Sequence, residues 1–398
     1  MSRKFVIPCL LVLSLALFGC NLSGNNAPPA APTETAVAPD FVTVTPIPPV
    51  EIATNTLEVA TTAPSATVPT VPTATASPAP SLTSAPMATN TAVPIPNPAT
   101  VKYIDDRSTP SQVIVSLYNA INRQEYLRAY NYWVDPATSL GSFNSYANGY
   151  QDTASVSLVF GQISGDAGMS QVYYTIPVSL KAIARNGTQT NYAACYVVHQ
   201  TSPDVYGAPP FAPMGIDSGT ATVANIHASD ASVLATACNG SPSGPMQVAV
   251  SGESLNIDKG NFVDNRSGPI ETVSSFLNAL NRKQYVRAYS YYQNPTSYPG
   301  AYTPYAAGYA NTDVITVTFG TVLSEGAAGS LYYKVPLALH VLTTSSTKQT
   351  FVGCYTLRLA QPAVQGIPPF QPMGITAGKF QQVNNSVNVN PLLPTACN

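Results

Sequence analysis

Histidine and aspartate are the side chains of this sequence that could carry general acid–base catalysis, which needs a titratable group inside a pocket. Each can be compared with a counterpart, because residues 103–239 are repeated as residues 262–398. Asp152 is replaced by Asn311, which cannot act as a base. None of the three histidines has a histidine counterpart; they are His199, His227 and His340. The sequence also lacks HExxH and phosphate-loop motifs, so we expect that the protein is not an enzyme.

A second set of candidates recurs in both repeats and suits ligand binding rather than catalysis. Tyrosines that face an open pocket could stack on a sugar ring or an apolar ligand, and an arginine at its mouth could bind an anion. The structural alternative is that the tyrosines lie in the core and that the arginines pair with the recurring Asp105 and Asp264 or lie on a solvated face. The candidates are Tyr126, Arg128, Tyr130 and Tyr173, with Tyr285, Arg287, Tyr289 and Tyr332.

Four cysteines have the same spacing in the two repeats and predict disulfides. Cys195 and Cys238 are 43 residues apart, as are Cys354 and Cys397. Four cysteines allow three pairings, and the duplication favours a bridge inside each repeat. Closing a loop of that length stabilises a fold by about 4 kcal/mol in the chain-entropy model, and it needs an oxidising compartment. A four-cysteine metal site is the alternative, but such sites use close CxxC pairs, so we expect no metal and no cofactor.

The N-terminus has the organisation of an export signal. Residues 2–4 include two cations, and the apolar run at 5–18 is short for a membrane span. The run ends in LFGC at 17–20, which resembles the bacterial lipobox, where a small residue precedes a cysteine that is acylated. This resemblance implies a signal peptide at 1–19 and an acyl anchor, such as palmitate, on Cys20 at the extracytoplasmic face of the cell membrane. An ordinary secretory signal or a short membrane anchor is the alternative.

Residues 20–100 have the composition of a disordered stalk. They are rich in proline, threonine, alanine and serine, as in TVPTVPTATASPAPSLTSAP. Prolines every few residues prevent both helices and central strands, and aromatic residues for a core are almost absent. We therefore predict an extended tether or spacer between the lipid and the rest of the chain.

The remainder of the chain is a duplicated domain. The repeats align at a constant offset, and PPFAPMGI at 209–216 returns as PPFQPMGI at 368–375. A period this long indicates two domains rather than a solenoid. We predict a first repeat at 101–239, a linker at 240–260 and a second repeat at 261–398.

Each repeat is expected to be an α+β domain. In the first repeat, helical periodicity and capping signals predict helices at 110–122, from Tyr126 to a stop at Asp135-Pro136, and at 143–150. Alternating apolar residues predict strands at 102–105, 156–160, 172–184, 192–200 and 220–226. The pattern predicts two or three N-terminal helices on one face of a curved antiparallel sheet of four or five strands.

Two helical runs carry a resemblance to a known superfamily. SLYNAINRQEYLRAYNYW at 116–133 and SFLNALNRKQYVRAYSYY at 275–292 resemble the openings of NTF2-like domains (cystatin-like α+β, SnoaL/ketosteroid-isomerase-like). Glu125 and Gln284 stand where aspartate is common in those openings. The resemblance covers both repeats and implies a cone between helices and sheet. The superfamily includes enzymes, binding modules and inert domains, so function must be argued from the site.

The expected function combines this architecture with the composition. Only 9% of residues are charged and the formal net charge is −2, which argues against nucleic acid as a partner. We expect a membrane-anchored lipoprotein whose paired domains are a non-catalytic binding or spacer module, with a polysaccharide or protein partner at the cell envelope. The alternative is a small-molecule-binding protein or an isomerase/dehydratase-like enzyme that uses the cone. An open cone with an acid inside would favour the alternative, and a cone filled by tyrosine and phenylalanine would exclude it.

Overall fold

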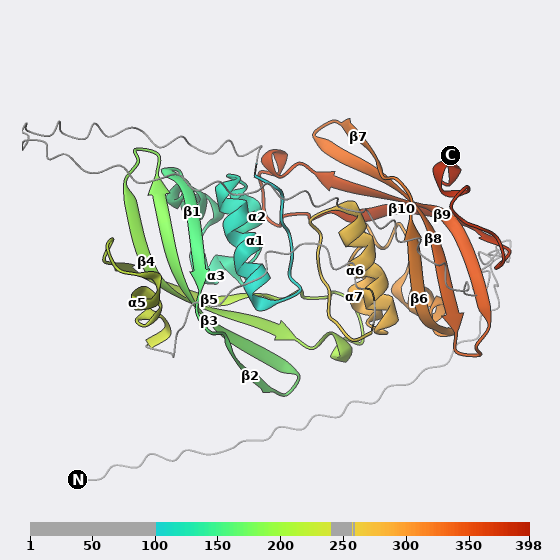
Figure 1. The fold of residues 1–398 in the computed structure, drawn as a ribbon, viewed down its shortest axis with the longest axis horizontal. Helices are drawn as coiled ribbons and strands as arrows, with labels where there is room; N and C mark the ends of the chain where they lie inside the picture. The colour runs from blue at the N-terminus through green and yellow to red at the C-terminus, as the bar shows by residue number, and fades with distance from the viewer. Residues whose placement is uncertain (1–100, 240–256, 258) are drawn as a thin grey trace, which may run out of the picture. The chain divides into compact units, whose positions relative to one another are not determined.

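The computed structural model describes residues 101–239, 257 and 259–398. The predicted signal peptide, Cys20, the stalk and most of the predicted linker lie outside the described residues. The described part of the chain is α+β, with two five-stranded antiparallel sheets and several short helices (Figure 1). Among the described residues, no helix is both long and apolar enough to span a membrane.

The two repeats have nearly the same order of elements. The first contains α1 (Pro110–Asn122), α2 (Tyr126–Tyr130), α3 (Pro136–Leu140), α4 (Phe143–Gly149), β1 (Thr153–Phe160), β2 (Ser164–Gly168), β3 (Gln171–Ala184), β4 (Gln189–Thr201), β5 (Gly215–Ala224) and α5 (Asp230–Leu234). The second contains α6 (Pro269–Asn281), α7 (Tyr285–Tyr289), α8 (Tyr302–Gly308), β6 (Thr312–Phe319), β7 (Leu323–Ala327), β8 (Ser330–Thr343), β9 (Lys348–Ala360) and β10 (Gly374–Val383). The sheets run β1-β3-β4-β5 and β6-β8-β9-β10, with β2 and β7 paired to β3 and β8.

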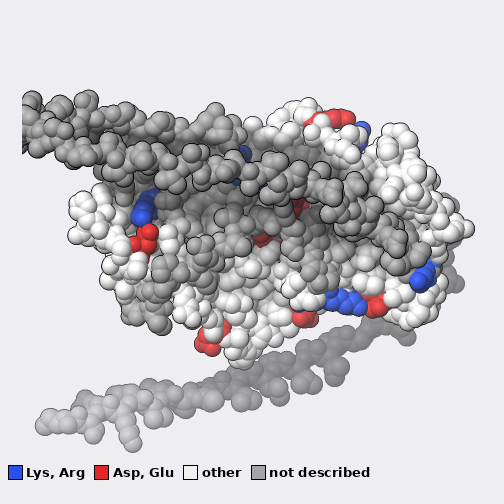
Figure 2. All heavy atoms as spheres, in the orientation of Figure 1, with Lys and Arg blue, Asp and Glu red and all other residues white. Residues whose placement is uncertain are grey.

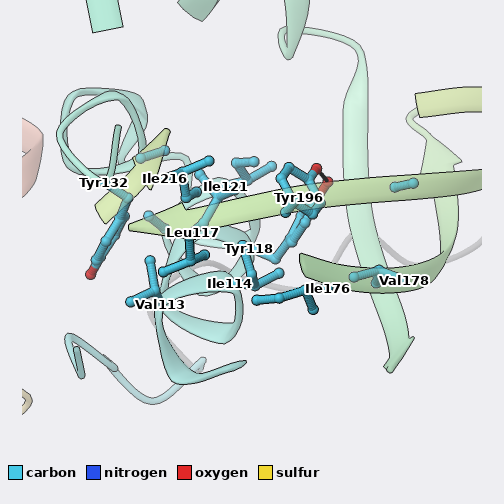
Figure 3. Packing of buried hydrophobic residues seen from close by; sticks show 14 of the residues in the cluster. Val113, Ile114, Leu117, Tyr118, Ile121, Tyr132, Ile176, Val178, Tyr196 and Ile216 are labelled. Atoms are coloured by element: carbon cyan, nitrogen blue, oxygen red, sulfur yellow. Dashed lines mark hydrogen bonds between the residues drawn. The ribbon is translucent and has the colours of Figure 1, made fainter. Parts of the chain in front are cut away.

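Helix α1 forms because its sequence combines a cap with an apolar stripe. The Thr109 side chain accepts a backbone hydrogen bond from the first turn, and Pro110 occupies a position where no N–H is needed. Val113, Leu117 and Ile121 follow at helical spacing and are at most 2% exposed. This stripe packs on the sheet and forms the core of the first repeat (Figure 3).

An asparagine at the end of each first helix fixes the helix to the sheet. Asn122 donates to the Val156 carbonyl at 2.9 Å and accepts from the Val156 N–H at 2.7 Å. Asn281 exchanges the same two bonds with Ile315. The amide therefore sets where the helix lies along the first long strand, and with it the width of the space between them.

The two faces of each sheet are covered differently. On β3, Val178 and Leu180 are buried with the residues of α1, and we call this the inner face. Side chains alternate along a strand, so Ser179 and Lys181 lie on the outer face, where both bond to Asp230 of α5. The outer face is thus covered by the C-terminal tail of the repeat.

Each tail is held to its sheet by a disulfide. Cys195 on β4 is bonded to Cys238, and Cys354 on β9 is bonded to Cys397. This is the pairing within repeats that the duplication favours. Two disulfides indicate an oxidising, extracytoplasmic location. Charged groups are few on the described surface seen in Figure 2, in keeping with the low charge of the sequence.

The strand predicted at 102–105 is wrong. Its segment makes only an isolated bridge at Asp106, because side chains of α1 take its backbone hydrogen bonds. The Ile104 N–H donates to Asn119 Oδ1 at 3.0 Å, and the Asp106 N–H donates to Ser116 Oγ at 2.9 Å. With these donors satisfied by side chains, no ladder forms.

The predicted stop of the second helix is also wrong. Helix α2 already ends at Tyr130, and Asp135-Pro136 begins α3 instead. The Asp135 carboxylate accepts from the Thr138 N–H at 3.3 Å, as an N-cap does. The sequence analysis also did not predict β2, which is short and fully exposed. The other helices and strands predicted for the first repeat are present, with ends shifted by a few residues.

The segments before α1 and α6 contact each other reciprocally. The Asp105 N–H donates to Ser267 Oγ at 2.8 Å, and the Asp264 N–H donates to Ser108 Oγ at 2.9 Å. Both repeats fall in one compact unit of the chain. Because matching residues supply both bonds, the contact has approximate twofold symmetry.

Candidate functional site

A cavity of about 440 Å³ opens on the inner face of the first sheet. Its polar lining consists of hydroxyl groups, and none of the residues that line it is charged. Aliphatic side chains from α3, β1 and β3, with Ala221 of β5, complete the wall. Its aromatic lining is made of five tyrosines, Tyr118, Tyr146, Tyr150, Tyr192 and Tyr196.

These tyrosines come from three parts of the fold. Tyr118 lies on α1, while Tyr146 lies on α4 and Tyr150 caps its C-terminus. Tyr192 and Tyr196 lie on β4, an even number of residues apart, so both reach the inner face. The rings of Tyr146 and Tyr150 meet edge to face, with centroids 5.1 Å apart. Helix and sheet therefore supply opposite walls of one aromatic chamber.

A pair of phenols lies where α1 faces β4. The Tyr118 and Tyr196 hydroxyls are 2.5 Å apart and hydrogen-bonded, and both side chains are buried (Figure 3). Burial raises the pKa of both phenols well above that of a free tyrosine. Both are therefore protonated near neutral pH, and their mutual bond uses only one of the two protons. The second proton is available to an acceptor.

Tyr146 also lines the cavity, but its hydroxyl is buried. Its side chain is 8% exposed, and burial raises the pKa of its phenol. The hydroxyl lies near that of Tyr150, yet it forms no hydrogen bond of normal geometry. A buried hydroxyl without a partner costs free energy.

The acid–base candidates of the sequence lie elsewhere. Asp152 is exposed at the start of β1, and His227 is exposed after β5. His199 stacks on Tyr173 with ring centroids 4.5 Å apart. Burial lowers the pKa of His340 to about 4, and its Nε2 bonds to a threonine on the neighbouring strand. No histidine or carboxylate is among the residues that line the cavity, which offer aromatic rings and hydroxyl groups.

The corresponding space in the second repeat is occupied by larger side chains. Phe380 stands in place of Ala221, and Val341 stands in place of Ala182. The Phe380 ring packs edge to face on Tyr355, the counterpart of Tyr196, with centroids 4.8 Å apart.

Two local features of the second repeat accommodate this ring. Gly353 pairs with Phe380 across the ladder, and an added Cβ there would collide with the ring and with the Lys379 carbonyl. Ala194 stands at the matching position of the first repeat. Tyr298 adds a further ring, and its hydroxyl donates to the Gly378 carbonyl at 3.2 Å.

The recurring arginines are structural. Arg128 is 1% exposed and donates to Glu125 at 2.7 Å and to Asn119 at 2.9 Å. Arg287 makes the same bonds to Gln284 and Asn278. Neither lies on a solvated face.

Neither arginine forms a direct ion pair with Asp105 or Asp264, although each carboxylate attracts the nearby guanidinium. The tyrosine hydroxyls of Tyr132 and Tyr291 donate to Asp105 and Asp264, each at 2.7 Å. Arg128 lines a small cavity of about 60 Å³ and does not line the aromatic chamber.

None of the six recurring tyrosines lines the 440 Å³ cavity. Tyr126 stacks on Tyr150 and Tyr130 packs on Tyr146, so both support the lining from behind. Tyr285 and Tyr289 make the matching contacts in the second repeat. Tyr173 lies on β3 and is 43% exposed. Tyr332 is half-buried at the matching position of β8.

Residues that differ between the repeats mark the cavity better than residues that recur. The second repeat has Phe380, Val341 and Leu277 where the first has Ala221, Ala182 and Tyr118. A comparison of side-chain sizes at matching inward-facing positions would have found them from the sequence.

Comparison with protein-family models, with curated proteins and with solved structures gives no match to this chain. The cavity and the difference between the repeats are therefore the basis for a function.

Proposed function

We propose that the first repeat binds a small uncharged molecule in its aromatic cavity and that the second repeat is a structural partner. The observation that carries this proposal is the difference at one place in the fold. The first repeat has an open chamber of about 440 Å³, a size typical of small-molecule sites. The second repeat has Phe380 and Val341 where the first has alanines.

The cavity supports binding rather than catalysis. General acid–base chemistry needs a group whose pKa lies near the working pH, and burial raises the pKa of Tyr118, Tyr146 and Tyr196 in this chamber. A pure spacer would have no use for an open cavity, which costs packing free energy. The first repeat keeps this space, while the second has a packed alternative of the same fold.

The setting of this binding domain is also part of the proposal. The chain would be a lipoprotein anchored through Cys20, with residues 21–100 as a tether at the extracytoplasmic face of the cell membrane. The disulfides Cys195–Cys238 and Cys354–Cys397 support the oxidising location. Helices followed by an antiparallel sheet in each repeat support an NTF2-like fold. A polysaccharide or protein of the envelope remains the proposed neighbour of the tethered domains.

The test fills the first cavity as the second repeat fills its own. The double change Ala194→Gly and Ala221→Phe copies the Gly353 and Phe380 pair. Binding of two uncharged probes, 2-naphthol and its saturated counterpart 2-decalol, is measured by equilibrium dialysis against the full chain. We expect the filled variant to lose affinity for both by about tenfold or more, because a phenyl ring takes the volume that they need.

The matched control is Thr220→Phe. It adds the same ring on the same strand at an exposed position, and alternation directs it away from the cavity. It should leave binding unchanged. Probe binding that is equal in the wild-type and filled chains would refute the cavity as the binding site.

A further inference from the structure

We infer that the ligand of the first repeat is a neutral aromatic compound. This inference rests on the proposed function and adds the chemical class of the ligand. In this arrangement the aromatic ring lies against Tyr196, as the Phe380 ring lies against Tyr355 in the second repeat.

The second repeat indicates which shape the chamber accepts. There the Phe380 ring meets Tyr355 edge to face, with an interplanar angle of 63°. Tyr196 occupies the position of Tyr355 and is itself in an edge contact with Trp133. Ala221 leaves the place of the phenyl ring free and is exposed. An aromatic ligand could therefore occupy the volume that the Phe380 side chain fills in the second repeat.

Aromatic character is favoured over a saturated ring by the walls of the chamber. Five tyrosines line it, and edge-to-face contacts between aromatic rings stabilise beyond the area that they bury. A sugar is disfavoured, because its many hydroxyls would need polar partners. Apart from the phenols, the side-chain hydroxyls of the wall are only Ser145 and Thr153.

A charged ligand is disfavoured for a related reason. No lysine, arginine, histidine, aspartate or glutamate lines the chamber. A carboxylate or an ammonium group would lose its hydration without gaining an opposite charge, which is strongly unfavourable. The ligand is therefore neutral in its bound form.

The experiment compares 2-naphthol with 2-decalol on the full chain by equilibrium dialysis. The two probes share a two-ring skeleton and a hydroxyl and differ in aromaticity. We expect 2-naphthol to bind roughly two- to tenfold more tightly, the range given by aromatic edge contacts.

The variant Thr220→Phe is the matched control and should change the affinity for neither probe. Equal affinity for 2-naphthol and 2-decalol, with both lost in the Ala194→Gly/Ala221→Phe chain, would overturn the aromatic class and leave the cavity as a binding site. Binding of neither probe, or binding that the filled variant keeps, would overturn this inference and the proposed function together.

Discussion

Asp106 shows how one residue makes the two repeats differ in their response to pH. The carboxyl is 3% exposed, and burial raises its pKa to about 6. It accepts from the Ser108 N–H at 2.8 Å and from the Asn265 side chain at 3.3 Å. Asn265 occupies the position in the second repeat that matches Asp106. The contact therefore joins the titratable carboxyl of Asp106 to a neutral amide at the matching position.

The change Asp106→Asn is expected to stabilise the protein at neutral pH. Folding raises this pKa, so the folded chain holds the proton more tightly than the unfolded chain does. The resulting stability is present below about pH 4 and is lost as the pH rises through about 6. Denaturant unfolding at pH 7.5 should give a gain of roughly 1–3 kcal/mol for the variant. The difference should vanish near pH 4.

The reciprocal change provides the control. Asn265→Asp places a second carboxyl against Asp106, so it should destabilise the chain at pH 7.5 and have little effect at pH 4. If Asp106→Asn gave the same stability difference at both values of pH, the buried carboxyl would not be its cause.

At the scale of elements, the tail of each repeat acts as a cover for the outer face of its sheet. In the first repeat, Val233 and Ala237 of the tail pack on Ala193 of β4. In the second, Val389 and Leu393 pack on Val352 of β9. These clusters are small, so the bridges are needed to keep the tails in place.

Removal of one bridge should therefore destabilise one repeat and spare the other. The double change Cys195→Ala and Cys238→Ala is expected to cost about 4 kcal/mol in the unfolding of the first repeat. Hydrogen exchange of β4 and β9 amides would follow the two repeats separately. The change of Cys354 and Cys397 is the matched variant and should affect β9. Loss of protection in both sheets from either variant would show that the repeats do not unfold independently.

Much of the element order could be predicted, because local signals and packing agree. Thr109 and Pro110 begin α1 as the capping pattern indicates, and Asn122 ends it. The prediction at Asp135-Pro136 was wrong because the same pair of residues can either end one helix or cap the next. Which of the two occurs depends on where Tyr130 packs. The failed strand before Asp106 depends on side chains of α1, which local propensity cannot describe.

The site was harder to predict than the fold. Tyr118 lies in the apolar stripe of a helix and has the pattern of a core residue. Ala221 gives no signal by itself, since its role is to be smaller than Phe380. The recurring Tyr126 and Tyr130 were chosen instead, and they support the lining from behind. Residues that recur are the ones that both repeats need for folding. A site that is present in one repeat is instead marked by residues that differ between the repeats.

For the whole molecule, the N-terminal sequence predicts attachment to a membrane. Cys20→Ser removes the only proposed acylation site, which lies outside the described residues. The variant should move from the membrane fraction to the soluble fraction of a cell extract, because acyl chains supply the buried area for anchoring. Cys9→Ser, a change inside the proposed signal peptide, is the control and should leave the protein on the membrane. Retention of Cys20→Ser there would instead indicate an uncleaved N-terminal anchor.

The Phe380 ring has a consequence for how the protein would respond to ligand concentration. A tandem repeat is usually read as bivalent, and two tethered sites can gain avidity for a clustered target. Here the second chamber is taken by its own side chain, so a chain that carries two copies of the domain would bind one molecule. Its occupancy would rise along a simple hyperbola, without cooperativity, and tethering many chains on one membrane would be the remaining route to multivalent capture.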